Sequence, residues 1–197
     1  MSGDGVDTSK RRFLTAAATV VGGIGAVYTA VPFLASWMPS EKAKAAGAPV
    51  EADISKLETG QMIRVQWRGK PVWVLRRSDE MLEALPTLDG SLRDPNSEEA
   101  QQPVYAQNTG RSIKPEVLVA VGICTHLGCS PSFVPEAVPQ PYDPKWKGGF
   151  FCPRHGSRFD LAGRVYQGVP APLNLEVPPY KYISDTLILV GEDTGAA

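Results

Sequence analysis

The pattern of apolar and polar positions divides the chain into two unequal parts. After Arg12 no charged residue occurs until Glu41, and residues 13–37 are mostly apolar or small. At about 1.5 Å per residue, a helix over this stretch crosses a hydrocarbon core of about 30 Å. The pattern therefore predicts a transmembrane anchor helix over residues 13–38. Basic residues before it place residues 1–12 in the cytoplasm.

The segment after the apolar run admits a second interpretation. Ala43-Lys44-Ala45 offers a small-x-small site at which a secretory signal could be cleaved. However, the apolar run is longer than the roughly 7–15 residues of a signal core, which favours an uncleaved anchor. Residues 39–50 contain Pro, Ala and Lys and have little to bury, so we expect a flexible hinge.

From residue 51 onward the pattern changes to that of a β domain. Alternating positions predict strands over 62–67 and 71–75, joined by a turn at 68–70. Residues 116–123 form a continuous apolar run, which indicates a buried strand. A short helix is expected over 78–85 with Ser78 as its N-cap, and residues 86–103 are expected to form a polar surface loop. Further strands are predicted over 164–167, 173–177 and 186–190.

Composition adds little beyond this outline. The net charge is −1 and gives no sign of nucleic-acid binding. The 19 glycines and 18 prolines, most of them after residue 85, fit a loop-rich β domain better than a helical bundle. We therefore expect a mainly β protein: a single transmembrane helix, then an antiparallel β domain that occupies residues 51–197.

The candidate chemistry lies in two short boxes. The chain has only three cysteines and two histidines, and four of these residues form Cys124-x-His126 and Cys152-x-x-His155. Two thiolates and two imidazoles suit either a structural zinc or a two-iron cluster. Zinc sites more often pair cysteine with cysteine and histidine with histidine. Because each box here supplies one ligand of each kind, the spacing favours a 2Fe-2S cluster.

Replacing two thiolates by imidazoles has a redox consequence. Four thiolates around an oxidised 2Fe-2S core leave a net charge of about −2, whereas two thiolates and two neutral imidazoles leave about zero. Reduction is then easier, at roughly −150 to +300 mV instead of about −400 mV. The boxes therefore predict a high-potential electron-transfer site.

Four sequence runs carry a resemblance to a known family. They are GICTHLGC at 122–129, GGFFCP at 148–153, HGSRFD at 155–160 and GVPAP at 168–172. Together they resemble the Rieske iron–sulfur subunit of the bacterial cytochrome bc complex, ubiquinol–cytochrome c reductase. The likeness extends to the N-terminal anchor, and Lys10-Arg11-x-Phe13-Leu14 resembles a twin-arginine export signal.

The resemblance implies a role for each residue of the boxes. By position, Cys124 and Cys152 match the ligands of one iron, and His126 and His155 match the ligands of the other. Ser157 matches a hydroxyl donor to a bridging sulfide, and Leu127 matches the apolar residue at the docking tip of the family. The cluster-binding subdomain corresponds to residues 121–173.

Two positions depart from the family pattern. The family joins a cysteine at the position of Cys129 to a second one at the position of Arg154, so we expect Cys129 to have no intramolecular partner. Such a cysteine is a free thiol, an intermolecular one or a small buried apolar residue. A loop-joining disulfide contributes about 2–4 kcal/mol, so looser loops are expected. Phe159 replaces a tyrosine that bonds a ligand sulfur, which predicts a lower reduction potential.

The function that the resemblance implies is electron transfer in respiration. His155 would accept a hydrogen bond and a proton from ubiquinol, and the electron would pass to a c-type cytochrome subunit. The expected partners are this cytochrome, a b-type cytochrome subunit and ubiquinol, within a dimeric, membrane-embedded complex. The chain would lie in the bacterial inner membrane, as a single-pass protein with its soluble domain in the periplasm.

Other classes of Rieske and metal protein are alternatives. A catalytic oxygenase subunit needs two further histidines for a mononuclear iron, and both histidines here are committed. A soluble Rieske ferredoxin needs neither an anchor nor a hinge. The small subunit of an exported oxidase resembling arsenite oxidase shares both signal and cluster, and is the main alternative. A zinc-stapled interaction module is the alternative without redox activity.

Overall fold

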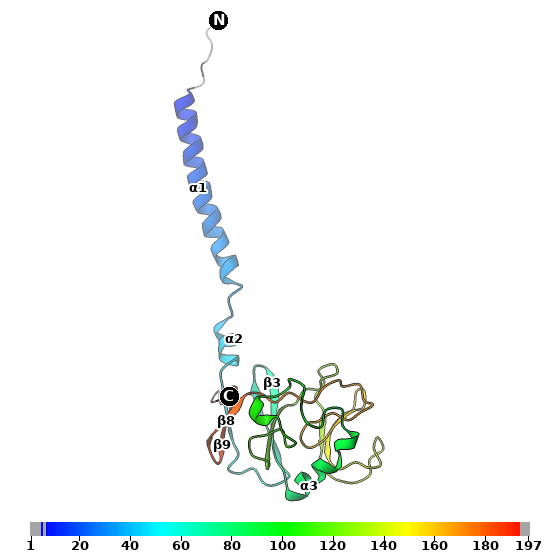
Figure 1. Ribbon diagram of the computed structural model, residues 1–197. Helices are drawn as coiled ribbons and strands as arrows, with labels where there is room; N and C mark the ends of the chain where they lie inside the picture. The colour runs from blue at the N-terminus through cyan, green and yellow to red at the C-terminus, as the bar shows by residue number, and fades with distance from the viewer. Residues whose placement is uncertain (1–4, 6, 194–197) are drawn as a thin grey trace. The chain divides into compact units, whose positions relative to one another are not determined.

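The computed structural model describes residue 5 and residues 7–193, which fall into two compact units, residues 1–45 and 46–197. The first contains helix α1 (Thr8–Ala35), and the short helix α2 (Glu41–Ala46) follows it (Figure 1). Asp7 caps α1 by accepting hydrogen bonds from the N–H groups of Ser9 and Lys10, each at 3.1 Å. Residues 1–4 and 6 of the predicted cytoplasmic segment lie outside the described residues.

Helix α1 has the length and composition of a membrane span. Its 28 residues extend about 42 Å at about 1.5 Å each, more than a hydrocarbon core of about 30 Å. None of its side chains is buried within the structure. Within the described part of the chain it is the one helix long and apolar enough to cross a membrane. The predicted apolar N-terminal helix is therefore confirmed.

The second unit consists of three antiparallel sheets of three strands, ordered β1-β9-β8, β2-β3-β4 and β5-β6-β7. The first sheet comprises β1 (Val50–Asp53), β9 (Leu187–Val190) and β8 (Tyr180–Ser184). The second comprises β2 (Met62–Trp67), β3 (Lys70–Arg76) and β4 (Val117–Val121). The third comprises β5 (Ser132–Val134), β6 (Gly149–Cys152) and β7 (Ser157–Phe159). The helical elements are α3 (Asp79–Thr87) and two 3-10 turns, Asp89–Ser91 and Val104–Ala106.

Strands β3 and β4 are buried on both faces, which explains the unbroken apolar run that precedes the first Cys-His box. Side chains alternate across a strand, so Val72 and Val74 enter one core while Trp73 and Leu75 enter the other. The first core lies toward β1, β8 and β9 and contains Ile188. The second contains the aromatic rings of β6 and β7 together with two of the cysteines. The middle sheet thus supports the site from behind.

Several predicted elements agree with the structure. The strand over 62–67 and the strands within 71–75, 116–123 and 186–190 are present. Ser78 caps α3 by accepting a hydrogen bond from the N–H of Met81, at 3.3 Å. Together with the apolar N-terminal helix, these strands confirm the predicted fold class, a mainly antiparallel β protein.

Two predicted strands are wrong. Residues 164–167 and 173–177 form no strand, although most of their side chains are buried. Val165 and Tyr166 make only isolated β-bridges, to Phe159 and Leu92. The side chain of Asn174 accepts from the N–H of Val165 at 2.8 Å, and the N–H of Leu175 donates to the Gly163 carbonyl. Bridges and side-chain bonds thus replace a continuous strand ladder. The predicted surface loop at 86–103 is wrong in part, because it buries Leu92 and Ser97.

Three buried arginines hold the turn that follows β7. Arg164 pairs with Asp160 at 2.7 Å, and both side chains are fully buried. Arg77 donates to the Leu161 carbonyl at 3.2 Å, and Arg111 donates to the Ala162 carbonyl at 3.3 Å. Burial lowers the pKa of Arg77 and that of Arg111 to about 10, and the Asp160 carboxylate opposes the shift. Arg77 and Arg111 therefore keep their charge at neutral pH, and the three arginines anchor the end of the β6–β7 hairpin.

Candidate metal centre

Three loops meet at the end of the β5-β6-β7 sheet. We call residues 124–129 the first Cys-His loop, residues 152–157 the second Cys-His loop and residues 168–172 the proline loop. The first follows β4, and the second joins β6 to β7. Each Cys-His loop therefore starts from a strand whose other residues lie in the core.

The first Cys-His loop closes on itself. The N–H of Cys124 donates to the Cys129 carbonyl at 2.7 Å, and the N–H of Gly128 donates to the Cys124 carbonyl at 3.0 Å. Gly128 adopts a φ of +78°, which residues with a Cβ rarely take. The closure brings Cys129 back beside Cys124. It also leaves Leu127 at the loop's outer end, with 73% of its surface exposed.

The second Cys-His loop is a hairpin turn. Cys152 and Ser157 lie opposite each other at the ends of β6 and β7. The N–H of Gly156 donates to the Cys152 carbonyl at 2.9 Å, with Gly156 at a φ of +75°. Cys152 and Ser157 are buried, whereas Arg154 and His155 between them are exposed. The turn thus separates a buried sulfur from an exposed imidazole.

The two loops bring the candidate ligands together. The sulfur atoms of Cys124, Cys129 and Cys152 all lie within 4.8 Å of one another. The rings of His126 and His155 lie edge to face, with their centroids 4.8 Å apart. The Nδ1 atom of His126 is buried and has no hydrogen-bond partner. A buried imidazole nitrogen without a partner is unfavourable unless it binds a metal or a water molecule.

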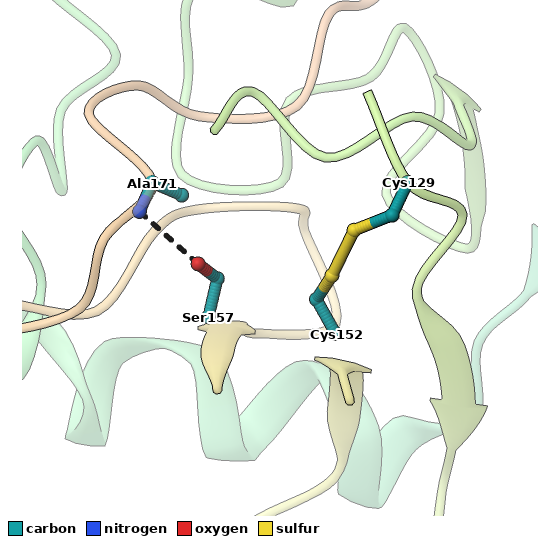
Figure 2. Close-up of a disulfide and its surroundings, with 4 residues drawn as sticks. All are labelled: Cys129, Cys152, Ser157 and Ala171. Atoms are coloured by element: carbon teal, nitrogen blue, oxygen red, sulfur yellow. Dashed lines mark hydrogen bonds between the residues drawn. A yellow bond between two sulfur atoms is a disulfide. The ribbon is translucent and has the colours of Figure 1, made fainter. Parts of the chain in front are cut away.

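Cys129 does not lack a partner in this structure. It forms a disulfide with Cys152, and Cys124 remains the free cysteine (Figure 2). The expectation of an unpaired Cys129 is therefore wrong. The physical reason is the closure of the first Cys-His loop, which turns Cys129 toward the end of β6. With arginine at position 154, the thiols within its reach are those of Cys124 and Cys152, and the structure has the bond to Cys152.

Hydrogen bonds connect the proline loop and its next residue to both Cys-His loops. The Ser157 hydroxyl oxygen accepts from the N–H of Ala171 at 3.1 Å (Figure 2). The Thr125 hydroxyl donates to the Leu173 carbonyl at 2.7 Å. Accepting from Ala171 leaves the Ser157 proton available to another acceptor. Sequence reasoning singled out Ser157 but missed Thr125, although a hydroxyl residue inside a ligand box could have indicated such a bond.

Arg154 stands where the family has a disulfide-forming cysteine, and the described residues form no ion pair with it that could replace the lost bond. Among the residues that the structure describes, its guanidinium pairs with no carboxylate. Phe159, the second departure from the family pattern, is fully buried in the core behind the loops. Arg154 therefore adds an exposed positive charge next to His155.

The donor set fits a two-iron cluster under one condition. Two thiolates and two imidazoles from separate loops are the ligands of such a centre, and Cys124, His126, Cys152 and His155 can supply them. The condition is that Cys152 be reduced, because the disulfide with Cys129 occupies its sulfur. The same donors could also hold zinc, so comparison with known proteins decides between the two.

Two family models match the chain. Residues 1–40 match "Ubiquitinol-cytochrome C reductase Fe-S subunit TAT signal", and residues 95–180 match "Rieske [2Fe-2S] domain". The ubiquinol–cytochrome c reductase iron–sulfur subunit of Allochromatium vinosum is 62% identical over 197 residues, all of this chain and 95% of that protein. Its counterpart from Bradyrhizobium diazoefficiens is 43% identical over 187 residues, 93% of this chain and 94% of that protein.

Among solved structures, a chain of "Hyperthermophilic respiratory Complex III" is 28% identical with a TM-score of 0.48, covering 90% of this chain and 98% of its own. The curated relatives support neither a zinc-stapled module nor the subunit of an arsenite-oxidase-like enzyme. The cofactor is accordingly a Rieske-type 2Fe-2S cluster. The chain belongs to the iron–sulfur subunits of ubiquinol–cytochrome c reductase, the oxidoreductase of respiratory complex III.

Proposed function

We propose that this subunit takes an electron and a proton from ubiquinol and delivers the electron to a c-type cytochrome subunit. The ligands are Cys124 and Cys152 on one iron and His126 and His155 on the other. One observation carries the proposal: the buried sulfurs of Cys124 and Cys152 lie beside an exposed imidazole at the end of the β5-β6-β7 sheet. Such an arrangement gives a partner access to the centre through His155.

The chain's own residues have distinct tasks in this reaction. When bound, the cluster supplies a one-electron acceptor. His155 is exposed and accepts a hydrogen bond from the quinol hydroxyl at the ring nitrogen not used in metal binding, where it then holds the proton. Leu127 packs against the apolar wall of the quinol pocket, because an apolar side chain with 73% of its surface exposed is available to a partner. Ser157 donates its free hydroxyl proton to a sulfide, which favours the reduced state.

The quinol pocket requires a partner subunit. We assign its remaining wall to the b-type cytochrome subunit, with a dimeric complex as the whole assembly. Helix α1 and the family together indicate a membrane-anchored protein. We place the chain in the bacterial inner membrane with its soluble domain in the periplasm, because Lys10, Arg11 and Arg12 precede the apolar stretch.

Movement between two redox partners needs a hinge, which we assign to residues 39–50. The division between the two compact units falls at residues 45 and 46, inside this segment. The short helix α2 also lies there. An alanine-rich segment of one to two turns gains little from helix formation, so it can lengthen or shorten at small cost.

The function can be tested with Leu127→Ala in the purified complex. Losing a buried leucine contact costs about 1.5–3 kcal/mol, so quinol-dependent cytochrome c reduction should fall about tenfold or more. The paramagnetic signal of the reduced cluster should stay unchanged, since Leu127 is no ligand. Val138→Ala is the matched control, because Val138 is a half-exposed apolar residue outside the three loops. Full activity of the Leu127 variant, or a complex purified without b-type haem, would contradict the proposal.

A further inference from the structure

Cys152 has two possible partners in this chain. Its sulfur bonds to Cys129 in the structure, while the ligand set proposed above needs it as a thiolate on iron. A sulfur in a disulfide cannot donate as a thiolate. The two arrangements are therefore mutually exclusive. Cys124 is a ligand in the proposed arrangement and a free thiol in the disulfide arrangement.

Only one other thiol in the chain, that of Cys124, could compete with Cys152 for Cys129. The chain holds three cysteines in all, and their sulfurs share one small cluster. Position 154, between Cys152 and His155, could have offered a thiol. In this chain it is Arg154, and its side chain is exposed. Cys129 thus has no other sulfur besides Cys124 and Cys152 with which to pair inside the chain.

Backbone contacts of the two loops hold the competing sulfur beside Cys152. Backbone hydrogen bonds close the first Cys-His loop, from Cys124 to Cys129 and from Gly128 to Cys124. The strand pairing of Cys152 with Ser157 fixes the other side. Cys129 is partly exposed and both of its neighbours are exposed, so an oxidant can reach it first.

We propose that Cys129 and Cys152 form a redox switch that decides whether the chain can hold its cluster. The proposal rests on the ligand set assigned above. In a cluster-free chain, an oxidant such as hydrogen peroxide removes two electrons from the two thiols. One S–S bond forms, two S–H bonds break, and the peroxide is reduced to two water molecules. A dithiol reductant reverses the step by exchange and is itself converted to a disulfide.

The switch can be tested on the full-length protein in detergent by counting thiols. Iron is removed with a chelator in air, free thiols are alkylated, and the peptides are analysed by mass spectrometry. We expect one alkylated residue, Cys124, and a linked peptide pair containing Cys129 and Cys152 that is lighter by two hydrogens. The cluster-loaded protein, unfolded in the alkylating reagent without oxidant, should instead give three alkylated cysteines. Three free thiols in the air-treated apoprotein, or a bond from Cys129 to Cys124 or to a second chain, would overturn the proposal.

Reconstitution with iron and sulfide gives a second measurement. Without reductant the oxidised apoprotein should regain no cluster absorbance, and after treatment with dithiothreitol it should regain it. Cys129→Ser should take up iron and sulfide without any reductant, because Cys152 stays free. Ser130→Ala, an exposed neighbour, should behave like the unaltered chain. If Cys129→Ser still required the reductant, the switch would be wrong.

Two further variants separate this proposal from the ligand assignment. Cys152→Ser should lose the cluster entirely; if it keeps a Rieske-type paramagnetic signal, the ligand set fails. If it loses the cluster but the apoprotein of the unaltered chain shows no bond between Cys129 and Cys152, the switch alone fails. Arg154→Cys offers Cys129 another thiol, so its cluster should survive peroxide longer than that of the unaltered chain. If the cluster of Arg154→Cys survived peroxide no longer than that of the unaltered chain, and Cys129 were still linked to Cys152, position 154 would play no part in the choice of partner. That result would overturn this part of the proposal.

Discussion

The sheets behind the site and the loops that form it are stabilised in different ways. Strands β3 and β4 bury side chains on both faces, and their residues contribute to both hydrophobic cores. The three loops instead depend on individual hydrogen bonds, on three glycines with positive φ and on one sulfur–sulfur bond. We therefore expect folding and cofactor binding to be separable here. The sheets should form without the cluster, while the cluster needs loops that the sheets only position.

The strongest test of this separation removes a ligand. His126→Ala deletes an imidazole whose Nδ1 is buried and unpaired, so iron binding should be lost completely. The folded sheets should remain, because His126 is not part of either core. Iron analysis and paramagnetic resonance measure the first effect. Thermal unfolding followed by circular dichroism should match that of the unaltered apoprotein, and a much lower midpoint would contradict the separation.

The converse test weakens the first core, which lies toward β1, β8 and β9 and contains none of the candidate ligands. Ile188→Ala in β9 removes a fully buried side chain, which should lower the free energy of unfolding by about 2–5 kcal/mol. The cluster signal of the folded fraction should keep its shape, because β9 lies in a sheet that carries no ligand. Chemical denaturation measures the loss. Ile183→Ala, at a half-exposed isoleucine, is the control and should change stability little.

Ser157→Ala tests a residue that belongs to both regions. The substitution leaves the N–H of buried Ala171 without its acceptor, at a cost of about 1–3 kcal/mol. It should also lower the reduction potential, since a hydrogen bond to the electron-rich sulfide is lost. Potentiometric titration checks this second effect. Ser132→Ala, on the exposed face of β5, should alter neither quantity; an unchanged potential in Ser157→Ala would rule out the sulfide bond.

The smallest expected effect concerns the hydrogen bond from the Thr125 hydroxyl to the Leu173 carbonyl, next to the proline loop. Thr125→Val keeps the side-chain shape but removes the donor to the Leu173 carbonyl, which should cost about 0.5–1.5 kcal/mol. Hydrogen exchange of the proline loop should become faster, while exchange in β3 and β4 stays slow. Thr125→Ser retains the hydroxyl and should restore slow exchange. Equal exchange in all three proteins would mean that this bond does not hold the loop.

The sequence indicated the sheets better than the irregular segments. Strands such as 62–67 follow the alternation of their side chains, and Ser78 caps its helix locally, so nearby residues decide both. Residues 164–167 have the composition of a strand. The N–H of Val165, however, donates to the side chain of Asn174, nine residues away. A pattern within one segment contains no information about such a bond.

The site shows the same division. Both Cys-His boxes were evident from their spacing, and the structure brings their cysteines and histidines together. The pairing of Cys129 with Cys152 was not, because it depends on how two loops 23 residues apart approach each other. The buried arginines also escaped notice. Arg77 and Arg111 lie far along the chain from the turn that they hold, and nothing near them in the sequence marks them as buried.

The buried pair of Asp160 and Arg164 has a consequence for how this sequence can vary. Replacing Arg164 alone leaves the Asp160 carboxylate without its ion-pair partner in the interior, which costs about 3–5 kcal/mol. Replacing Asp160 alone removes the buried partner of Arg164, whose guanidinium then keeps only the half-exposed Asp89, at 2.9 Å, as an ion-pair partner. Arg164 also donates to the Leu85 carbonyl at 2.7 Å. An apolar residue at position 164 therefore leaves this buried carbonyl without its donor as well. Single-step substitutions at either position pass through an unstable protein. The two residues are therefore expected to be inherited together, and a lineage that changes one should be found to have changed both.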